Sequence, residues 1–355
     1  MWTVRVNGIP ERLNQKAFTV NGKTYSFDSC SYSRSDSDGS SGYNLDVYIF
    51  DHASYRWDMR KTRLLPRDGP ILIFGRSVVA YGHCAYLWGG WHDSPGMNGL
   101  RRFDTVSMTW SRPQERGDVP RSQISHSACV LGHRMYIFGG FDRNSLNIVC
   151  FLDLEKLEWH RVPTSGEAPA RRYCHTASAI GTRMYVWGGN LGSSQPNERY
   201  DNSLYYLETT TATWVRPQVQ GVAPEGRECH AGFVYDRELY IFGGYNRLLN
   251  THYTDMHKYD VEKSRWTKMT PTGSGPSARH SPCCSVLGER VLIFGGFGPA
   301  PILEEEEEMT DLHVLHLAPT LQNLCILAVI DADLDMSQLP DLIIKEISTI
   351  ISGQS

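Results

Sequence analysis

The chain has 355 residues, of which 41% are apolar and 21% are charged, an ordinary composition for a globular protein. Its formal net charge of −4 argues against general nucleic-acid binding, which requires an excess of lysine and arginine. The first residues, MWTVRVNGIP, lack the apolar core of a signal peptide, and no apolar run approaches the about eighteen residues of a membrane-spanning helix.

The nine cysteines are scattered along the chain and form no CxxC pair. This spacing favours neither a zinc framework nor a disulfide scaffold. We therefore expect reduced thiols in a cytosolic or nuclear protein, with no metal and no cofactor.

A short apolar segment that ends in two glycines recurs along the chain. A degenerate copy, YSFDS, comes first at residues 25–29, and the others end at Gly90, Gly140, Gly189, Gly244 and Gly296. Each of the first five copies is followed by a polar loop, a strand, a turn and a tryptophan. The tryptophans Trp57, Trp110, Trp159, Trp214 and Trp266 lie 53, 49, 55 and 52 residues apart. A period of about fifty residues resembles that of kelch repeats, which fold as four-stranded propeller blades.

The sixth tryptophan of the pattern is Trp2, at the opposite end of the chain. WTVRVNGIPER repeats the order of features seen after Trp266: tryptophan, strand, a glycine and proline, then arginine. We therefore expect an all-β, six-bladed kelch propeller over residues 1–318, with residues 1–10 completing the last blade. Such closure removes an exposed sheet edge. The acidic run at residues 304–308 is expected to be a solvated, disordered insertion.

The loops expected at the mouth of the central channel contain the candidate binding residues. Arg172 and Arg227 begin Arg-x-x-His motifs that end at His175 and His230, while Arg279 and Arg12 occupy the same slot without the histidine. The loops after the glycine pairs add Trp91, Asn190, Tyr245, Asn246 and Arg247. The arginines either brace neighbouring blades or converge as a positive funnel for a carboxylate, which arginine holds bidentately. The recurring histidines, His126, His175 and His230, favour hydrogen bonding in the core over metal binding.

The last 37 residues, 319–355, have a different pattern. After Thr320, a plausible helix cap, Leu321, Leu324, Cys325, Ala328 and Val329 share one face of a helix. A second helical segment opens at residues 339–340, with proline in its first turn, and places Ile343, Ile347, Ile350 and Ile351 in a stripe.

Residues 320–329, TLQNLCILAV, resemble the BC-box that inserts a leucine and a cysteine into Elongin C, and residues 339–347, LPDLIIKEI, resemble a cullin-2 box. With both boxes behind a propeller, the chain is similar to the kelch substrate receptors of cullin-2 RING ubiquitin ligases. The resemblance implies a non-catalytic substrate-recognition subunit. Its implied partners are Elongin B, Elongin C, cullin 2 with its RING subunit, and client proteins whose C-terminal carboxylate binds at the channel mouth.

The resemblance also implies roles for particular residues. Elongin C would contact Leu321, Leu324, Cys325, Ala328 and Val329, and cullin 2 would contact Leu339, Pro340, Ile343 and Ile347. Clients would contact Arg12, Trp91, Arg172, Tyr173, Asn190, Arg199, Arg227, Glu228, Tyr245, Asn246, Arg247 and Arg279. Two positions depart from the family pattern, because Asn190 replaces an arginine and Glu228 replaces a serine; Arg199 lies in the same loop as Asn190.

Two other functions remain open at this point. The first is a plain interaction scaffold whose C-terminal helices pack on their own propeller. The second is a metal-dependent enzyme, which the sequence disfavours because its recurring histidines lie one per blade.

Overall fold

The computed structural model describes most of the chain. The described residues are 1–7, 16–27, 31–33, 42–52, 54–64, 75–90, 99–192, 200–300, 306–331, 335–337, 339–341, 343–344 and 347–348.

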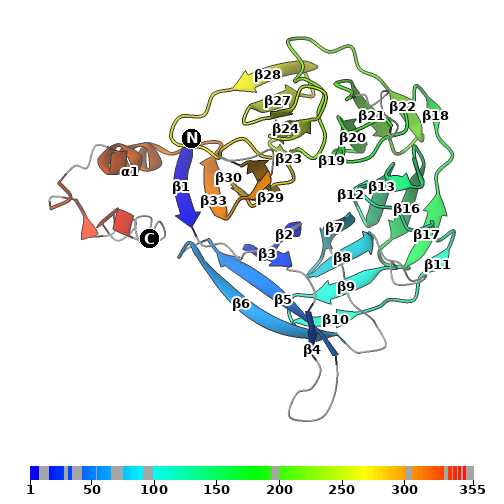
Figure 1. Ribbon diagram of the computed structural model, residues 1–355, viewed down its shortest axis with the longest axis horizontal. Helices are drawn as coiled ribbons and strands as arrows, with labels where there is room; N and C mark the ends of the chain where they lie inside the picture. The colour runs from blue at the N-terminus through cyan, green and yellow to red at the C-terminus, as the bar shows by residue number, and fades with distance from the viewer. Residues whose placement is uncertain are drawn as a thin grey trace.

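Within these residues, six sheets follow one another along the chain and surround a central axis as propeller blades (Figure 1). The first blade contains β2 (Lys16–Val20), β3 (Lys23–Phe27), β4 (Ser31–Ser33), β5 (Gly42–Asp51) and β6 (Arg56–Leu64). The second contains β7 (Arg76–Tyr81), β8 (Cys84–Gly89), β9 (Arg101–Asp104) and β10 (Thr109–Ser111). The third contains β11 (Arg116–Gly117), β12 (Ser127–Leu131), β13 (Arg134–Phe138), β16 (Val149–Asp153) and β17 (Glu158–Arg161).

The fourth to sixth blades repeat the arrangement. The fourth contains β18 (Ser165–Gly166), β19 (Thr176–Ile180), β20 (Arg183–Trp187), β21 (Leu204–Glu208) and β22 (Thr213–Val215). The fifth contains β23 (Ala231–Tyr235), β24 (Glu238–Phe242), β27 (Met256–Asp260) and β28 (Arg265–Met269). The sixth contains β29 (Cys283–Leu287), β30 (Arg290–Phe294), β33 (Asp311–His316) and β1 (Trp2–Asn7).

The second strand of each of blades two to six carries the apolar half of the repeat. These strands are β8, β13, β20, β24 and β30, whose side chains are almost all buried. They are buried because both faces of a blade are covered by neighbouring blades, which explains their continuous apolar sequence. The repeated tryptophans fill the space between blades; for example, the rings of Trp88 and Trp159 lie 5.0 Å apart.

The glycine pairs mark the places where adjacent blades approach most closely. Gly139 has a φ of +63°, and a Cβ there would lie 2.6 Å from the Arg172 carbonyl oxygen of the next blade. A side chain at this position would therefore clash with backbone, which accounts for the glycine.

The first strand of the chain belongs to the last blade. In the antiparallel pairing of β1 with β33, Trp2 is opposite Leu315 and Asn7 is opposite Asp311. The Trp2 N–H also donates to the Thr272 carbonyl at 2.8 Å, and the Trp2 indole is buried. The two ends of the propeller sequence thus share one sheet.

Short hairpins follow three of the glycine pairs. They are β14 (Phe141–Asp142) with β15 (Asn144–Ser145), β25 (Tyr245–Asn246) with β26 (Thr251–His252), and β31 (Phe297–Pro299) with β32 (Glu306–Glu308). The last hairpin shows that the prediction of a disordered acidic run is wrong for residues 306–308, because three glutamates pair with β31. Residues 304–305 lie outside the described part.

After the sixth blade the chain forms α1 (Leu321–Asp331), and helical backbone recurs at residues 341, 343–344 and 347–348. The helix lies on the outer rim of the ring beside the sixth blade (Figure 1). Ile326 and Ile347 are buried in one hydrophobic cluster with Phe50, Phe294 and Leu312, at the junction of the sixth and first blades. No helix in the described part of the chain has the length and apolar character to cross a membrane.

Candidate functional site

The segments between consecutive blades line the central channel. We call residues 123–126, 172–175, 227–230 and 279–282 the inter-blade loops. Their third residues, Ser125, Cys174, Cys229 and Ser281, all have left-handed backbone conformations, with φ between 52° and 54°. This shared conformation turns the backbone so that each loop can reach its neighbour.

The inter-blade loops are joined to one another by backbone hydrogen bonds around the channel. The Ser125 N–H donates to the Gly75 carbonyl at 2.9 Å, and the Cys174 N–H donates to the Ser125 carbonyl at 2.8 Å. The Cys229 N–H donates to the Cys174 carbonyl at 2.9 Å, and the Ser281 N–H continues the series to Cys229 at 2.6 Å. The channel wall is therefore a hydrogen-bonded belt that links successive blades.

The three described motif arginines are fully buried and do not form a free positive rim. Arg172, Arg227 and Arg279 are paired with Asp201, Asp255 and Asp311, respectively, with N–O distances of 2.7 Å for the first pair and 2.6 Å for the last.

Each arginine also donates to the carbonyl of the first glycine of its blade's pair, for instance Arg172 to Gly188 at 2.8 Å. The funnel prediction is therefore wrong for these three residues, because internal carboxylates and carbonyls use their donors. Each arginine side chain instead ties its inter-blade loop to the blade that follows, so its role is structural, although these bonds do not join two neighbouring blades.

Carboxylates in these pairs are held in the charged form. Burial alone would raise the pKa of Asp255, but hydrogen bonds from His257 and Arg227 hold that pKa well below its usual range. The pKa of Asp311 is lowered in the same way by His313 and Arg279. The arginine–aspartate pairs are thus stable parts of the framework.

The recurring histidines link adjacent blades. Nε2 of His126 lies 2.8 Å from Ser77 Oγ, Nε2 of His175 lies 2.7 Å from Ser127 Oγ, and Nε2 of His230 lies 2.8 Å from Thr176 Oγ1. Burial lowers the pKa of His126 and of His230 to about 3 and lowers that of His175 as well. These neutral rings are core hydrogen-bonding groups, as the sequence indicates.

Polar side chains between the fourth and fifth blades form a small network. The Tyr200 hydroxyl donates to Glu228 Oε1 at 3.1 Å, and the Asn190 amide lies 3.4 Å from Glu228 Oε2. Backbone bridges join Tyr173 to Asn190 and Glu228 to Tyr245. Five predicted contact residues, Tyr173, Asn190, Glu228, Tyr245 and the buried Asn246, therefore belong to neighbouring loops, with Arg247 exposed beside them.

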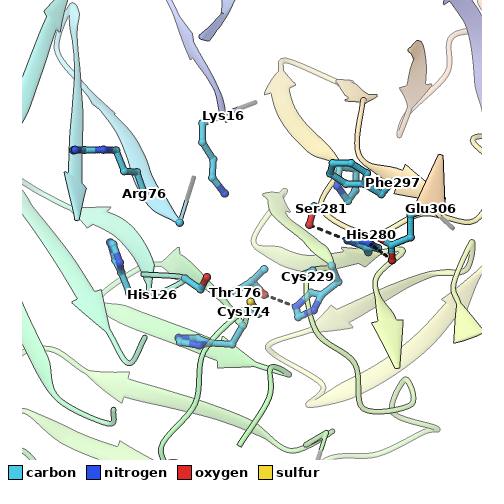
Figure 2. A pocket seen from close by; sticks show the side chains of 15 residues that line it. Lys16, Arg76, His126, Cys174, Thr176, Cys229, His280, Ser281, Phe297 and Glu306 are labelled. Carbon is cyan, nitrogen blue, oxygen red and sulfur yellow. Dashed lines mark hydrogen bonds and ion pairs between the residues drawn. The ribbon is translucent and has the colours of Figure 1, made fainter. Parts of the chain in front are cut away.

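A cavity of about 410 Å³ opens within the ring (Figure 2). Its lining includes the third residues of the inter-blade loops, with Lys16 and Arg76 contributed by the first two blades and His280 and Glu306 by the last. The cavity thus combines cationic, thiol, imidazole and carboxylate groups.

The C-terminal helix has one exposed and one buried face. Leu321 and Leu324 are 76% and 44% exposed, and Cys325 and Ala328 are also exposed. Val329 is half-buried, and the neighbouring Ile326 is buried. Of the predicted cullin contacts, Pro340 is exposed, Leu339 and Ile343 are half-buried, and Ile347 is fully buried. The predicted contact face is therefore largely open on α1 and largely covered in the following segment.

Comparison with known proteins agrees with this architecture. The model of the KLHDC2/KLHL20/DRC7 Kelch-repeats domain matches residues 75–296. The chain belongs to the kelch-repeat family. It is 37% identical over its full length to Kelch domain-containing protein 3 of Bos taurus and 36% identical to that of Homo sapiens, with 97% of each relative covered. Host cell factor 2 of Homo sapiens is 29% identical over 65% of this chain and 31% of its own length. A kelch propeller related to Kelch domain-containing protein 3 suggests a role in protein interaction.

Three of the predicted contact residues, Arg12, Trp91 and Arg199, lie outside the described residues.

Sequence reasoning missed Lys16 and Glu306 as cavity residues. The kelch pattern offered no signal for Lys16, because the first blade is degenerate. Position three of the inter-blade loops, by contrast, was identifiable from the repeat and contributes Cys174 and Cys229.

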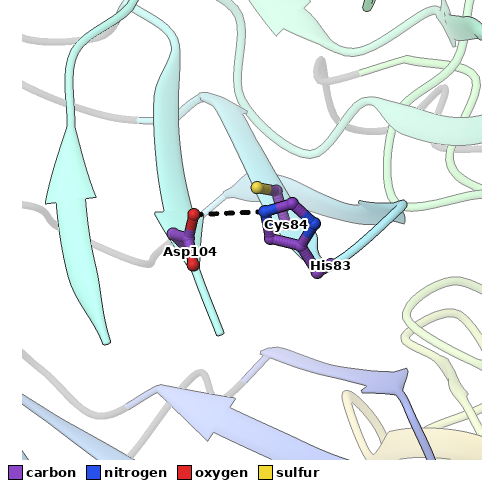
Figure 3. A group of neighbouring side chains, drawn as sticks. All are labelled: His83, Cys84 and Asp104. Atoms are coloured by element: carbon purple, nitrogen blue, oxygen red, sulfur yellow. Dashed lines mark hydrogen bonds and ion pairs between the residues drawn. The ribbon is translucent and has the colours of Figure 1, made fainter. Parts of the chain in front are cut away.

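A surface group on the second blade was also missed. His83, Cys84 and Asp104 lie together at a strand end, and His83 Nε2 is 3.2 Å from Asp104 Oδ2 (Figure 3). Asp104 Oδ1 accepts the backbone N–H groups of Val106 and Ser107, each at 2.9 Å. Asp104 therefore organises the turn of this kelch blade.

Proposed function

We propose that this kelch protein is a substrate-recognition subunit of a cullin-2 RING ubiquitin ligase. It captures client C-termini at the channel mouth and docks on Elongin B and Elongin C through α1. The chain itself is a non-catalytic receptor. The observation that carries this proposal is the exposure of Leu321, Leu324 and Cys325 on a helix that is otherwise fixed to the propeller.

The two faces of α1 support docking on a partner. Ile326 packs into the cluster between the sixth and first blades, so the helix already has a fixed position. The opposite side presents an apolar patch made of Leu321, Leu324, Cys325 and Ala328. A pre-positioned helix loses little conformational entropy on binding, which favours affinity.

The free energy available from burying a patch of this size can be compared with the cost of association. Burying a leucine side chain contributes about 1.5–3 kcal/mol, whereas association costs about 4–15 kcal/mol. Leu321, Leu324 and Cys325 together are marginal on that scale, so additional contacts by Leu339, Pro340 and Ile343 on cullin 2 would strengthen assembly. Ile347 instead anchors the segment to the propeller.

The client site is proposed at the cavity. Arg172, Arg227 and Arg279 are neutralised by aspartates, whereas Lys16, among the described residues that line the cavity, is an exposed cation that can meet a terminal carboxylate. Glu228 precedes the cavity residue Cys229, and the Tyr245 ring lies 5.9 Å from that of the cavity residue His280, so these two residues and Arg247 would contact the preceding client residues. Arg12, Trp91 and Arg199 remain predicted contacts.

The ligase assignment is tested by co-purification of Elongin B and C with the full chain. We expect Leu321→Ala combined with Cys325→Phe to abolish co-purification. The matched control is Leu248→Ala with Leu249→Ala, which removes two leucines that are similarly exposed, at 61% and 58%, on a propeller loop. The control should retain Elongin. Equal retention by both double variants would refute the proposal.

The client site is tested by peptide binding. Peptides with a free C-terminal carboxylate should bind more tightly than their amides, and Lys16→Gln should reduce this preference about fivefold, the upper end for a partly exposed ion pair. Lys23→Gln, on the neighbouring strand and also exposed, is the control. Equal binding of acids and amides would exclude carboxylate capture.

A second candidate function is a kelch interaction scaffold without a ligase role. The burial of Ile326 and Ile347 against the blades favours it, because the tail then has an internal structural purpose. Hydrogen exchange on the isolated chain and in the presence of Elongin B and C separates the two functions. Added Elongin should protect α1 further in a receptor and should change nothing in a scaffold.

A further inference from the structure

Two histidines and a glutamate from three separate segments converge beside the cavity, which two of them line. His252 lies on β26 of the fifth blade, His280 lies in the inter-blade loop before the sixth blade, and Glu306 lies on β32. Glu306 Oε1 is 3.0 Å from His280 Nε2 and 3.5 Å from His252 Nε2. The ligand atoms of all three residues lie within 4.8 Å of one another.

His252 is the least satisfied member of this group. Its side chain is only 10% exposed, yet its Nε2 has no hydrogen-bond partner among the described residues. A buried nitrogen without a partner is costly unless another group binds it. Imidazole nitrogen is a common metal ligand, so a metal ion is one group that could bind His252 Nε2.

The surroundings hold both rings in place. The rings of His252 and His280 stack with centroids 5.3 Å apart, and Tyr245 and Phe297 cover the outer sides at 4.4 Å and 5.4 Å. His280 Nδ1 is 3.0 Å from Ser281 Oγ. When Nδ1 donates to Ser281 Oγ, this outer hydrogen bond supports the tautomer whose Nε2 can bind a metal in place of its contact with Glu306.

We propose that His252, His280 and Glu306 bind a zinc ion. Zinc takes imidazole nitrogen and carboxylate oxygen at about 2.0–2.2 Å, so neighbouring ligand atoms in a tetrahedral site lie roughly 3.4 Å apart. The observed separations of 3.0 and 3.5 Å from Glu306 match that spacing without a large rearrangement. Three protein ligands leave a fourth position, and His280 and Glu306 line the cavity, as Figure 2 shows.

The two other groups of this kind among the described residues are weaker candidates. Cys174, Glu228 and Cys229 also cluster, but Glu228 is already held by Tyr200, and the pKa of Cys229 is raised through its hydrogen bond with Cys174 and by burial, which disfavours the thiolate. In the surface group of Figure 3, Asp104 is engaged in its turn. The zinc proposal is independent of the ligase assignment.

The experiment measures zinc bound by the metal-free full chain, using equilibrium dialysis against zinc chloride with elemental analysis. We expect one zinc per chain. Glu306→Gln and His252→Ala should each weaken binding roughly 100-fold or more, since loss of an outer-shell partner alone costs about 10–100-fold. Glu307→Gln, the neighbouring exposed glutamate of β32, should bind zinc like the unchanged chain. Circular dichroism checks that each variant is folded, and Glu306, being exposed, should tolerate substitution.

Cobalt substitution identifies the ligands. Nitrogen and oxygen ligands give d–d bands without a thiolate charge-transfer band, and these bands should disappear in Glu306→Gln but persist in His83→Ala. A thiolate band would place the metal at a cysteine-containing group, such as the one with Cys174 and Cys229 or the one with Cys84, and would overturn the proposal. Failure to bind zinc stoichiometrically, or equal binding by Glu306→Gln and Glu307→Gln, would also overturn it.

Discussion

At the scale of single residues, charge is neutralised inside the framework. Arg172, Arg227 and Arg279 have no exposed surface to offer a ligand, and each guanidinium is matched by an aspartate and a glycine carbonyl. A buried charge is tolerated only when it is paired in this way. These residues therefore hold the geometry of the repeat. Side chains at the mouth of the channel are the ones available for recognition.

Removing one partner of a buried pair should be costly. We expect Asp255→Ala to lower the free energy of unfolding by about 3–5 kcal/mol, because Arg227 would remain buried without its carboxylate. The control is Lys263→Ala, which breaks the surface pair with Asp260 and should lower the free energy of unfolding far less. Urea denaturation at pH 7 compares them. Similar losses in both variants would contradict the framework role of the pair.

The buried histidines should make stability depend on pH. The folded pKa of His126 and of His230 is about 3, below the ordinary 6.5, so the unfolded chain binds protons first as the pH falls. The contribution of these neutral rings to the free energy of unfolding is therefore present above about pH 6.5. It is lost progressively below that pH, by about 2 kcal/mol per histidine between pH 7 and 5. The carboxylates Asp255 and Asp311, whose pKa values are lowered, add a further loss only below about pH 4.

Denaturation of His126→Gln at pH 7 and pH 5 tests this dependence. The variant should be less stable at pH 7 but should lose about 2 kcal/mol less than the unchanged chain on going to pH 5. The unchanged chain, measured at the same two pH values, is the reference. An unaltered pH dependence in His126→Gln would show that this ring does not remain neutral in the fold.

At the scale of elements, the C-terminal helix separates structure from recognition on its two faces. The periodicity of residues 321–329 correctly indicates a helix, but the apolar stripe it defines points largely outward. Ile326, which lies off that stripe, packs against the blades. A stripe of leucines shows that a helix has an apolar face but does not identify what covers it.

Substitutions on the two faces should have different effects on the isolated chain. Ile326→Ala should speed hydrogen exchange throughout α1, because loss of a buried isoleucine costs about 2–5 kcal/mol. Leu324→Ala should leave that exchange nearly unchanged, since its side chain is 44% exposed. Hydrogen exchange with mass spectrometry measures both. Faster exchange in Leu324→Ala alone would reverse the assignment of the faces.

At the scale of the whole molecule, the ring depends on a strand from the other end of the chain. Trp2 is buried against Phe242 and His313, with ring centroids 6.2 and 6.1 Å away. Without β1, the outer edge of β33 would expose unpaired backbone groups, which invites association between molecules.

Weakening this closure should destabilise the entire propeller. We expect Trp2→Ala to lower the free energy of unfolding by about 3–5 kcal/mol. Deletion of residues 1–7 should in addition cause concentration-dependent oligomers, visible by size-exclusion chromatography with light scattering. A monomeric and equally stable deletion variant would mean that β1 does not support the ring.

The sequence by itself determined the repeat, the blades and the strands that fill them, because glycine pairs and tryptophans recur where neighbouring blades meet. It also placed the inter-blade loops at the channel. Only the tertiary structure decided which charged side chains are paired inside the propeller and which can meet a ligand. Asp201, Asp255 and Asp311 lie about thirty residues from the arginines they neutralise, and Glu306 joins two histidines from other segments. Charge pairing depends on distance in space, which spacing along one chain does not specify.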